Sequence, residues 1–126
     1  MIEKLALVAA GGAVGAALRY LVNTWALHHV PGLPLGTLIV NVLGSFAMGL
    51  VAVVLLERPG AWSHFAPLMM TGVLGGFTTF SAFSLDTLYL FERGRIALGA
   101  AYVAGSVLLS VGGLALGLLL ARRFLA

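Results

Sequence analysis

Long apolar stretches separated by short polar connections run along the whole chain. The apolar stretches cover residues 5–27, 35–56, 65–91 and 96–120, and the connections lie at 28–32, 57–60 and 92–95. A helix needs about 20 apolar residues to cross a hydrocarbon core of about 30 Å. The pattern therefore predicts an all-α membrane protein with four transmembrane helices, in a single transmembrane domain over residues 1–126.

The start of the chain resembles a secretory signal peptide, with Lys4 ahead of an apolar core. The apolar run resumes after Arg19 and continues to Leu27, which is too long for such a core. We therefore expect a retained first span.

The third apolar stretch is longer than a membrane requires, and its composition changes in the middle. Three glycines are followed there by three hydroxyl residues, namely Gly72, Gly75 and Gly76, then Thr78, Thr79 and Ser81. We expect two half-helices joined by a break at mid-membrane. Unwound backbone at that depth is tolerated only where protein or a water-filled cavity satisfies it. The carbonyls that it frees are ready ligands for a hard cation.

Two polar stripes lie on otherwise apolar spans. Each has three members at a spacing of four residues, Thr37, Asn41 and Ser45 in the second span and Tyr102, Ser106 and Ser110 in the fourth. Such residues share one helical face. A single hydroxyl usually bonds to its own helix or to a neighbouring one. Two whole stripes, one of them with an amide, favour a wet path.

The path suits an anion better than a cation. Hydroxyls and amides are donors, and the acids Glu3, Glu57 and Glu92 lie at span ends, so that only Asp86 is deeper. A cation or proton carrier usually needs an intramembrane carboxylate. Arg19 inside the first span either faces this cavity, extends to the interface or pairs with Asp86.

Two aromatic residues follow the expected break. Phe80 and Phe83 are three residues apart, so they share a face once the helix resumes. Aromatic rings carry a positive edge, and edges turned inward offer a small anion a weak contact that still lets it leave. Two phenylalanines in a span are more often lipid-facing or core residues, and their position after the break favours the pathway role.

Composition limits the remaining functions. The 126 residues are 61% hydrophobic and 9% charged, whereas about a quarter of an ordinary soluble domain is charged. No room remains for a catalytic domain, so an enzyme is not expected. The net charge of +3 comes from basic residues at span ends, where they contact lipid headgroups, and nucleic-acid binding is not expected.

Charge and glycine placement bear on assembly. Four basic residues, Lys4, Arg58, Arg122 and Arg123, lie on the side of the termini, against Arg93 and Arg95 on the other. This weak bias permits insertion in both orientations and hence an antiparallel dimer. Gly11 with Gly15, and Gly113 with Gly117, are expected to pack helices closely.

Three motifs together resemble the Fluc fluoride channels, also called the CrcB family. They are GGAVGAALRY at 11–20, GTLIVNVLGSF at 36–46 and GGFTTFSAF at 75–83, and the resemblance covers essentially the whole chain. It implies a dual-topology antiparallel homodimer in the cell membrane, with two fluoride pores along the subunit interfaces and a structural Na⁺ at the dimer centre. The implied activity is passive efflux of fluoride.

The resemblance also implies roles for particular residues. Pore residues are Asn41, Phe80 and Phe83, and the polar track is Tyr102, Ser106 and Ser110. Thr37 and Arg19 are assigned to the anion pathway by the stripe and by the intramembrane charge, not by the resemblance. Backbone carbonyls of Gly75 and Thr78 would hold the Na⁺, and Thr79 and Ser81 complete the motif. Asp86 stands where many relatives have a glutamate, and its shorter side chain reaches less far.

Two other functions fit a chain of this kind. A four-span proton-coupled exporter of the small multidrug resistance type has a similar size, but it depends on a glutamate in its first helix, where this chain has Arg19 and no acid after Glu3. A non-transporting membrane assembly subunit would use the glycines for packing and the hydroxyls to bind neighbouring helices.

Overall fold

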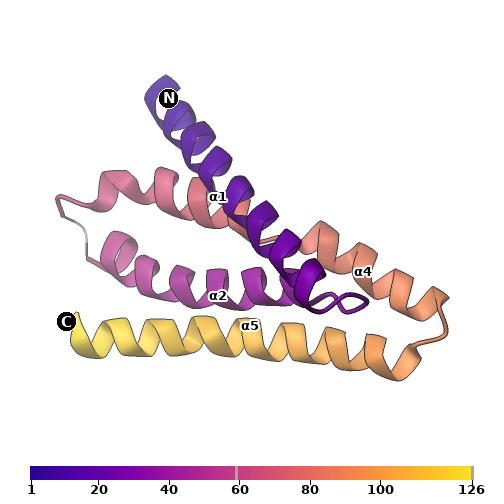
Figure 1. The fold of residues 1–126 in the computed structure, drawn as a ribbon. Coiled ribbons are helices and arrows are strands. Elements are labelled where there is room, and N and C mark those ends of the chain that lie inside the picture. The colour runs from indigo at the N-terminus through magenta and orange to yellow at the C-terminus, as the bar shows by residue number, and fades with distance from the viewer. Residues whose placement is uncertain (59, 126) are drawn as a thin grey trace.

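The protein is a bundle of four long helical segments (Figure 1), seen in a computed structural model that describes residues 1–58 and 60–125. Helix α1 covers Ile2–His29, α2 covers Leu35–Ala52 and continues as the π-helical turn η1, Val53–Glu57, and α5 covers Ile96–Phe124. The third segment consists of η2 (Ser63–Phe65), η3 (Pro67–Leu74), α3 (Gly75–Phe77) and α4 (Phe80–Glu92).

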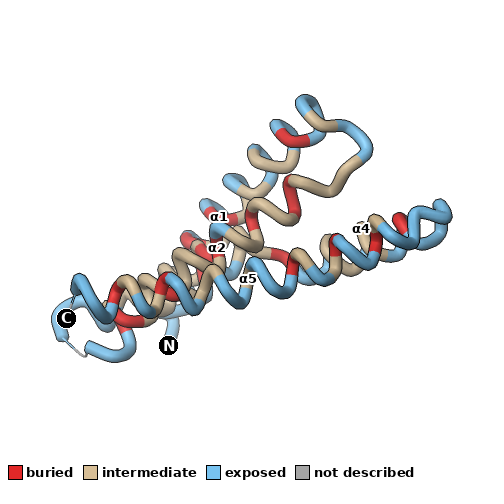
Figure 2. The backbone as a smooth tube through the Cα atoms, turned by 90° about the horizontal axis from the view of Figure 1, so that it is seen from below, coloured by how far each residue is buried: buried red, intermediate tan, exposed pale blue. Residues whose placement is uncertain are grey.

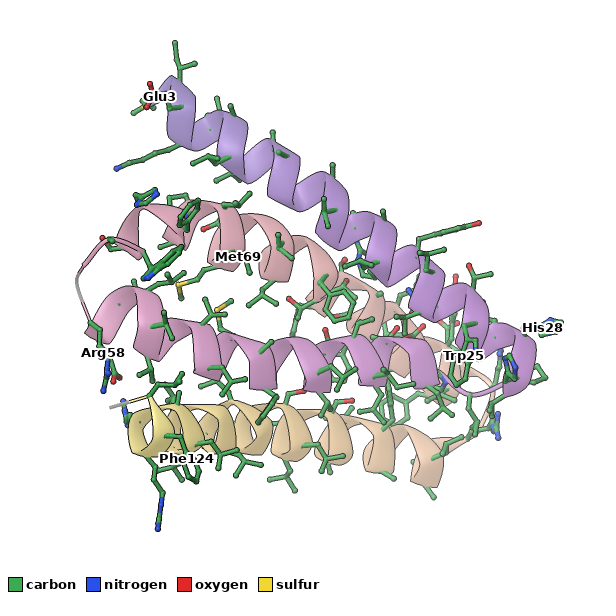
Figure 3. The ribbon with its side chains drawn as sticks, turned by 60° about the vertical axis from the view of Figure 1, so that its left-hand side comes forward. Glu3, Trp25, His28, Arg58, Met69 and Phe124 are labelled. Carbon is green, nitrogen blue, oxygen red and sulfur yellow. The ribbon has the colours of Figure 1, made fainter. Side chains whose placement is uncertain are left out.

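Each of the four segments is long and apolar enough to cross a membrane. Their bounds are Ile2–His29, Leu35–Glu57, Ser63–Glu92 and Ile96–Phe124, and each contains the stretch expected from the sequence. Figure 1 shows α2 and α5 running side by side, while α1 crosses them at an angle. Figure 3 places Glu3, Arg58 and Phe124 toward one end of the bundle and Trp25 and His28 at the other.

Glycines set the distances between the helices. A Cβ built on Gly72 would lie 3.0 Å from the Cα of Gly11, and one on Gly15 would overlap the backbone of the third segment. Between α2 and α5, a Cβ on Gly49 would lie 3.1 Å from the Cα of Gly117. These backbones touch because no side chain separates them. The predicted packing role is confirmed for Gly11, Gly15 and Gly117.

The predicted break in the third segment is confirmed, and it falls just after the glycines. Thr78 and Thr79 are extended, with φ/ψ of −84°/159° and −153°/122°, between the end of α3 and the start of α4. The hydroxyl of Thr79 accepts a hydrogen bond from the amide of Ala82 at 3.1 Å and so caps α4. Gly72 and Gly76 remain helical and pack against α1.

A single copy of the chain has a thin core. Figure 2 shows buried residues in short patches where helices meet, and exposed or intermediate residues elsewhere. Large apolar side chains cover much of the outside, and Phe80 next to the break is 78% exposed. Lipid or another protein surface must therefore cover most of the molecule.

Candidate functional site

A groove of about 400 Å³ lies beside the break in the third segment. It is bounded by α2, the break, the start of α4 and the middle of α5. The groove brings together most of the side chains that the sequence singled out, namely Asn41, Ser45, Thr78, Thr79, Phe80, Phe83, Ser106 and Ser110. Two members of each polar stripe therefore face the same space, although the stripes lie on separate helices.

The rings of Phe80 and Phe83 line this groove, and the ring of Tyr102 lies behind Phe83 without lining it. The ring centroids of Phe80 and Phe83 are 5.6 Å apart, at an interplanar angle of 55°, and Phe83 is 5.3 Å from the ring of Tyr102 at 46°. Tilted rings of this kind present edges as well as faces to their surroundings. The positive edges can contact a small anion without the binding strength of a charged group.

Two hydroxyls on α5 lack partners. Among the described residues, the oxygens of Ser106 and Ser110 are the buried side-chain polar atoms without a hydrogen bond. A buried hydroxyl left unpaired costs about 1–3 kcal/mol, so such groups call for an occupant. Tyr102 differs, because its hydroxyl donates to Oδ2 of Asp86 at 3.1 Å. Of the three predicted track residues, Ser106 and Ser110 line the groove with available hydroxyls, whereas Tyr102 does not line it and has its hydroxyl engaged.

Asn41 is joined to the break by two hydrogen bonds. Its Nδ2 donates to the carbonyl of Thr79 at 2.9 Å, and its Oδ1 accepts from the amide of Thr79 at 2.7 Å. In an unbroken helix the Thr79 amide would donate to the carbonyl of Gly75. The amide of Asn41 has therefore taken the place of one helical hydrogen bond.

The carbonyls of Gly75 and Thr78 are among the backbone groups that lose their helical partners at the break. In a continuous helix the amide of Thr79 would donate to the carbonyl of Gly75, but here it donates to Asn41. Likewise, the amide of Ala82 would donate to the carbonyl of Thr78, but it donates to the Thr79 hydroxyl. Free carbonyl oxygens at the end of a half-helix are the ligands that a hard cation such as Na⁺ takes in broken membrane helices. The residues that the resemblance implies for Na⁺ therefore fit that ion. No cluster of three or more acidic, His or Cys side chains occurs in the described part of the chain.

Arg19 approaches the break from the side of α1. Its Nε donates to the carbonyl of Gly76 at 3.0 Å, a group that the break also deprives of its helical donor. Among the described residues, the ion pair is the one between Glu57 and Arg122. Arg19 therefore does not pair with Asp86, and its side chain bonds to backbone instead. Arg19 does not line the groove.

The remaining expected site residues lie near the groove. Thr37 is buried at 6% exposure and occupies the same stripe of α2 as Asn41, without lining the groove. The hydroxyl of Ser81 is 3.3 Å from that of Thr79 and helps to fix the cap of α4.

Sequence reasoning missed the apolar groove residues. Met48 and Leu114 line the groove, and they lie three residues after Ser45 and four after Ser110. Both continue the polar stripes along the same helical faces. Their spacing was available from the sequence, but apolar side chains in an apolar span give no contrast that distinguishes a groove from lipid.

The fold and the groove define a small multi-pass membrane protein with a partly polar path at a broken helix. The family model described as CrcB-like protein, Camphor Resistance (CrcB), matches residues 6–118. The chain belongs to this family, which confirms the resemblance inferred from its three motifs.

Individual relatives are similar over their whole length. The chain is 55% identical to the fluoride-specific ion channel FluC of Paracoccus denitrificans (strain Pd 1222) over 119 residues, which is 94% of each chain. It is 52% identical to the protein of the same name from Cereibacter sphaeroides over 127 residues, covering all of both. A third relative of that name, from Agrobacterium fabrum, is 47% identical over 95% of this chain and 97% of its own.

Proposed function

We propose that this protein is a fluoride-specific ion channel, which lets fluoride leave the cell passively across the cell membrane. The observation that carries the proposal is the pair of unpartnered hydroxyls, Ser106 and Ser110, in a groove walled by Phe80 and Phe83. Three relatives at 47–55% identity carry the name fluoride-specific ion channel. Donors without acceptors suit an anion, and fluoride is the smallest and best acceptor of the halides.

Passive exit is useful because of how fluoride enters. Fluoride enters the cell as neutral HF, which crosses the membrane. HF then ionises at cytoplasmic pH, and the resulting anion is trapped inside. A selective leak driven by the membrane potential lowers its internal concentration and its toxicity. Fluoride is strongly hydrated, so the path must replace lost water with donors such as the serine hydroxyls and the amide of Asn41.

We propose that the pathway is completed by a second, inverted copy of the chain. One copy leaves Phe80, which lines the groove, 78% exposed. The weak charge bias between the two ends allows both orientations. An antiparallel pair would cover the exposed ring and enclose two equivalent paths.

We propose that a structural Na⁺ lies where the two breaks meet. The freed carbonyls of Gly75 and Thr78 in each copy would hold it, and the bound ion would offset the partial negative charge at the carbonyl end of α3 in both copies. The amino end of α4 lies beside the groove, because Thr79 and Phe80 both line it, and the partial positive charge of that end favours an anion. One interruption of one helix thus serves both signs of charge.

Flux from liposomes tests the proposal. The purified protein is placed in liposomes loaded with potassium fluoride, and efflux after valinomycin addition is followed with a fluoride electrode. Fluoride should leave far faster than chloride from matched vesicles, and the rate should not depend on a proton gradient. Efflux no faster than from protein-free vesicles would refute the channel, and coupling to a proton gradient would favour an exporter.

Cysteine labelling tests the dual topology. The chain has no cysteine of its own, so single cysteines can be introduced. One variant replaces Ser63, at the end of the bundle where both termini lie, and the other replaces His29, at the opposite end. A membrane-impermeant maleimide should label about half of each variant in intact cells. Full labelling of one variant with none of the other shows a single orientation and excludes an inverted pair.

A further inference from the structure

We propose that Asn41 is a positioning residue that keeps the third segment broken. The proposal starts from its two hydrogen bonds with one backbone residue, 2.9 Å to the carbonyl and 2.7 Å from the amide of Thr79. No other side chain of α2 bonds the break among the contacts of the described residues. Asn41 therefore pairs with Thr79 as a neighbouring β-strand would, although it lies on a helix.

The polarity of these partners fixes the orientation of the amide. A backbone N–H can only donate and a backbone carbonyl can only accept. The side-chain oxygen of Asn41 must therefore face the amide of Thr79, and its nitrogen must face the carbonyl. A flipped amide would bring two donors together and two acceptors together, which removes any ambiguity in the assignment.

This pairing prevents the helix from closing. The amide of Thr78 still donates to the carbonyl of Leu74 at 3.0 Å, so helical hydrogen bonding continues as far as Thr78. The next bond would run from the amide of Thr79 to Gly75, and Asn41 intercepts it. Without Asn41 the segment has a ready alternative, in which it extends the helix through Thr79 and the carbonyl of Gly75 is no longer free.

The same pairing determines which polar atoms of Asn41 remain available to an ion in the groove. The amide nitrogen carries two protons, and the carbonyl of Thr79 uses one of them. Asn41 lines the groove, and the second N–H of its amide remains free to donate to an ion. The two bonds to Thr79 turn the oxygen toward a backbone amide and leave one N–H of Asn41 to donate, which suits an anion.

The test compares the backbone at the break in two variants of Asn41. In Asn41→Leu both hydrogen bonds are lost, whereas Asn41→Asp keeps an acceptor for the Thr79 amide but sets an oxygen against the Thr79 carbonyl. Carbon chemical shifts of ¹³C,¹⁵N-threonine-labelled protein report whether Thr78 and Thr79 are extended or helical. Ser45→Ala, one turn along the same stripe, is the matched control for these shifts.

We expect extended shifts at Thr78 and Thr79 in the wild type and in Ser45→Ala. Asn41→Leu should move both toward helical values, and Asn41→Asp should move them partly. Should Asn41→Leu fail to fold, Asn41→Asp alone decides the question. Extended shifts that stay unchanged in every folded Asn41 variant overturn the positioning role.

The functional part of this inference rests on the proposed channel. Fluoride efflux should fall by about ten- to a hundredfold in Asn41→Leu, which corresponds to one hydrogen bond to a charged ion. A loss of efflux without a change in the threonine shifts would make Asn41 only a hydrogen-bond donor to the ion and would overturn its positioning role. If the wild type passes no fluoride, the channel proposal fails, but the threonine shifts still test the positioning role of Asn41 independently.

Discussion

Removing the hydroxyl of Ser106 should stabilise the protein and slow fluoride transport at the same time. The side chain is 5% exposed, and its oxygen has no hydrogen-bond partner in the described structure. In most buried sites a serine hydroxyl is paired, and its loss costs stability. Here the change Ser106→Ala removes a polar group that has no hydrogen-bond partner in the protein, so we expect the free energy of unfolding to rise instead of fall.

The two effects can be estimated separately. An unpaired buried hydroxyl costs about 1–3 kcal/mol, and water in the groove recovers part of this, so a gain of about 1 kcal/mol in unfolding free energy is expected. A hydrogen bond to a charged group contributes about 1.5–3 kcal/mol. Because about 1.4 kcal/mol equals a factor of ten, efflux should fall by about ten- to a hundredfold if fluoride uses this donor.

Thermal unfolding in detergent and fluoride efflux from liposomes measure the two quantities on one preparation. Ser84→Ala is the control, because the Ser84 hydroxyl already donates to the carbonyl of Phe80 at 3.0 Å. This control should leave efflux nearly unchanged and give no gain in stability. The reasoning fails if Ser106→Ala is less stable than the wild type, or if its efflux matches that of the control.

Three further predictions follow from the groove and the packing. Replacing Phe80 or Phe83 by Ile should lower fluoride efflux while gel filtration shows unchanged assembly, and full efflux in both variants removes the ring-edge argument. Tyr102→Phe should lower efflux less than the serine change, because this hydroxyl proton is already donated to a carboxylate; an equal loss would contradict that view. Gly49→Ala sets a methyl group against the backbone of α5 and should cost about 1–3 kcal/mol in stability. Gly112→Ala, whose Cβ would meet nothing within 4 Å, is its control, and equal stability of the two variants would refute the packing argument.

The sequence was sufficient for the elements and for most of the groove. Hydrophobic length alone predicts the four spans, and the spacing of four residues correctly grouped Asn41 with Ser45 and Ser106 with Ser110. These successes share a cause, since a polar residue in a membrane span is rare enough that its position carries information.

The exact place of the break and the partners of each donor were beyond the sequence. Glycines suggested a break near Gly75, but Gly72 and Gly76 are needed for contact with α1, and the extended residues are two threonines. Propensity cannot separate these roles, because both favour small or flexible residues. Nor does spacing reveal that Asn41 bonds backbone, because its partner lies 38 residues away.

The contacts between glycine backbones also bear on how the protein responds to temperature. Where Gly11 meets Gly72 and Gly49 meets Gly117, there are no side chains whose rotamers must be fixed when the helices associate. Such a contact has little entropy to lose and few alternative packings to explore on warming. We expect the spacing of α1, α2 and α5 to stay nearly constant between cold and warm growth, so that thermal motion is concentrated in the aromatic and hydroxyl side chains of the groove.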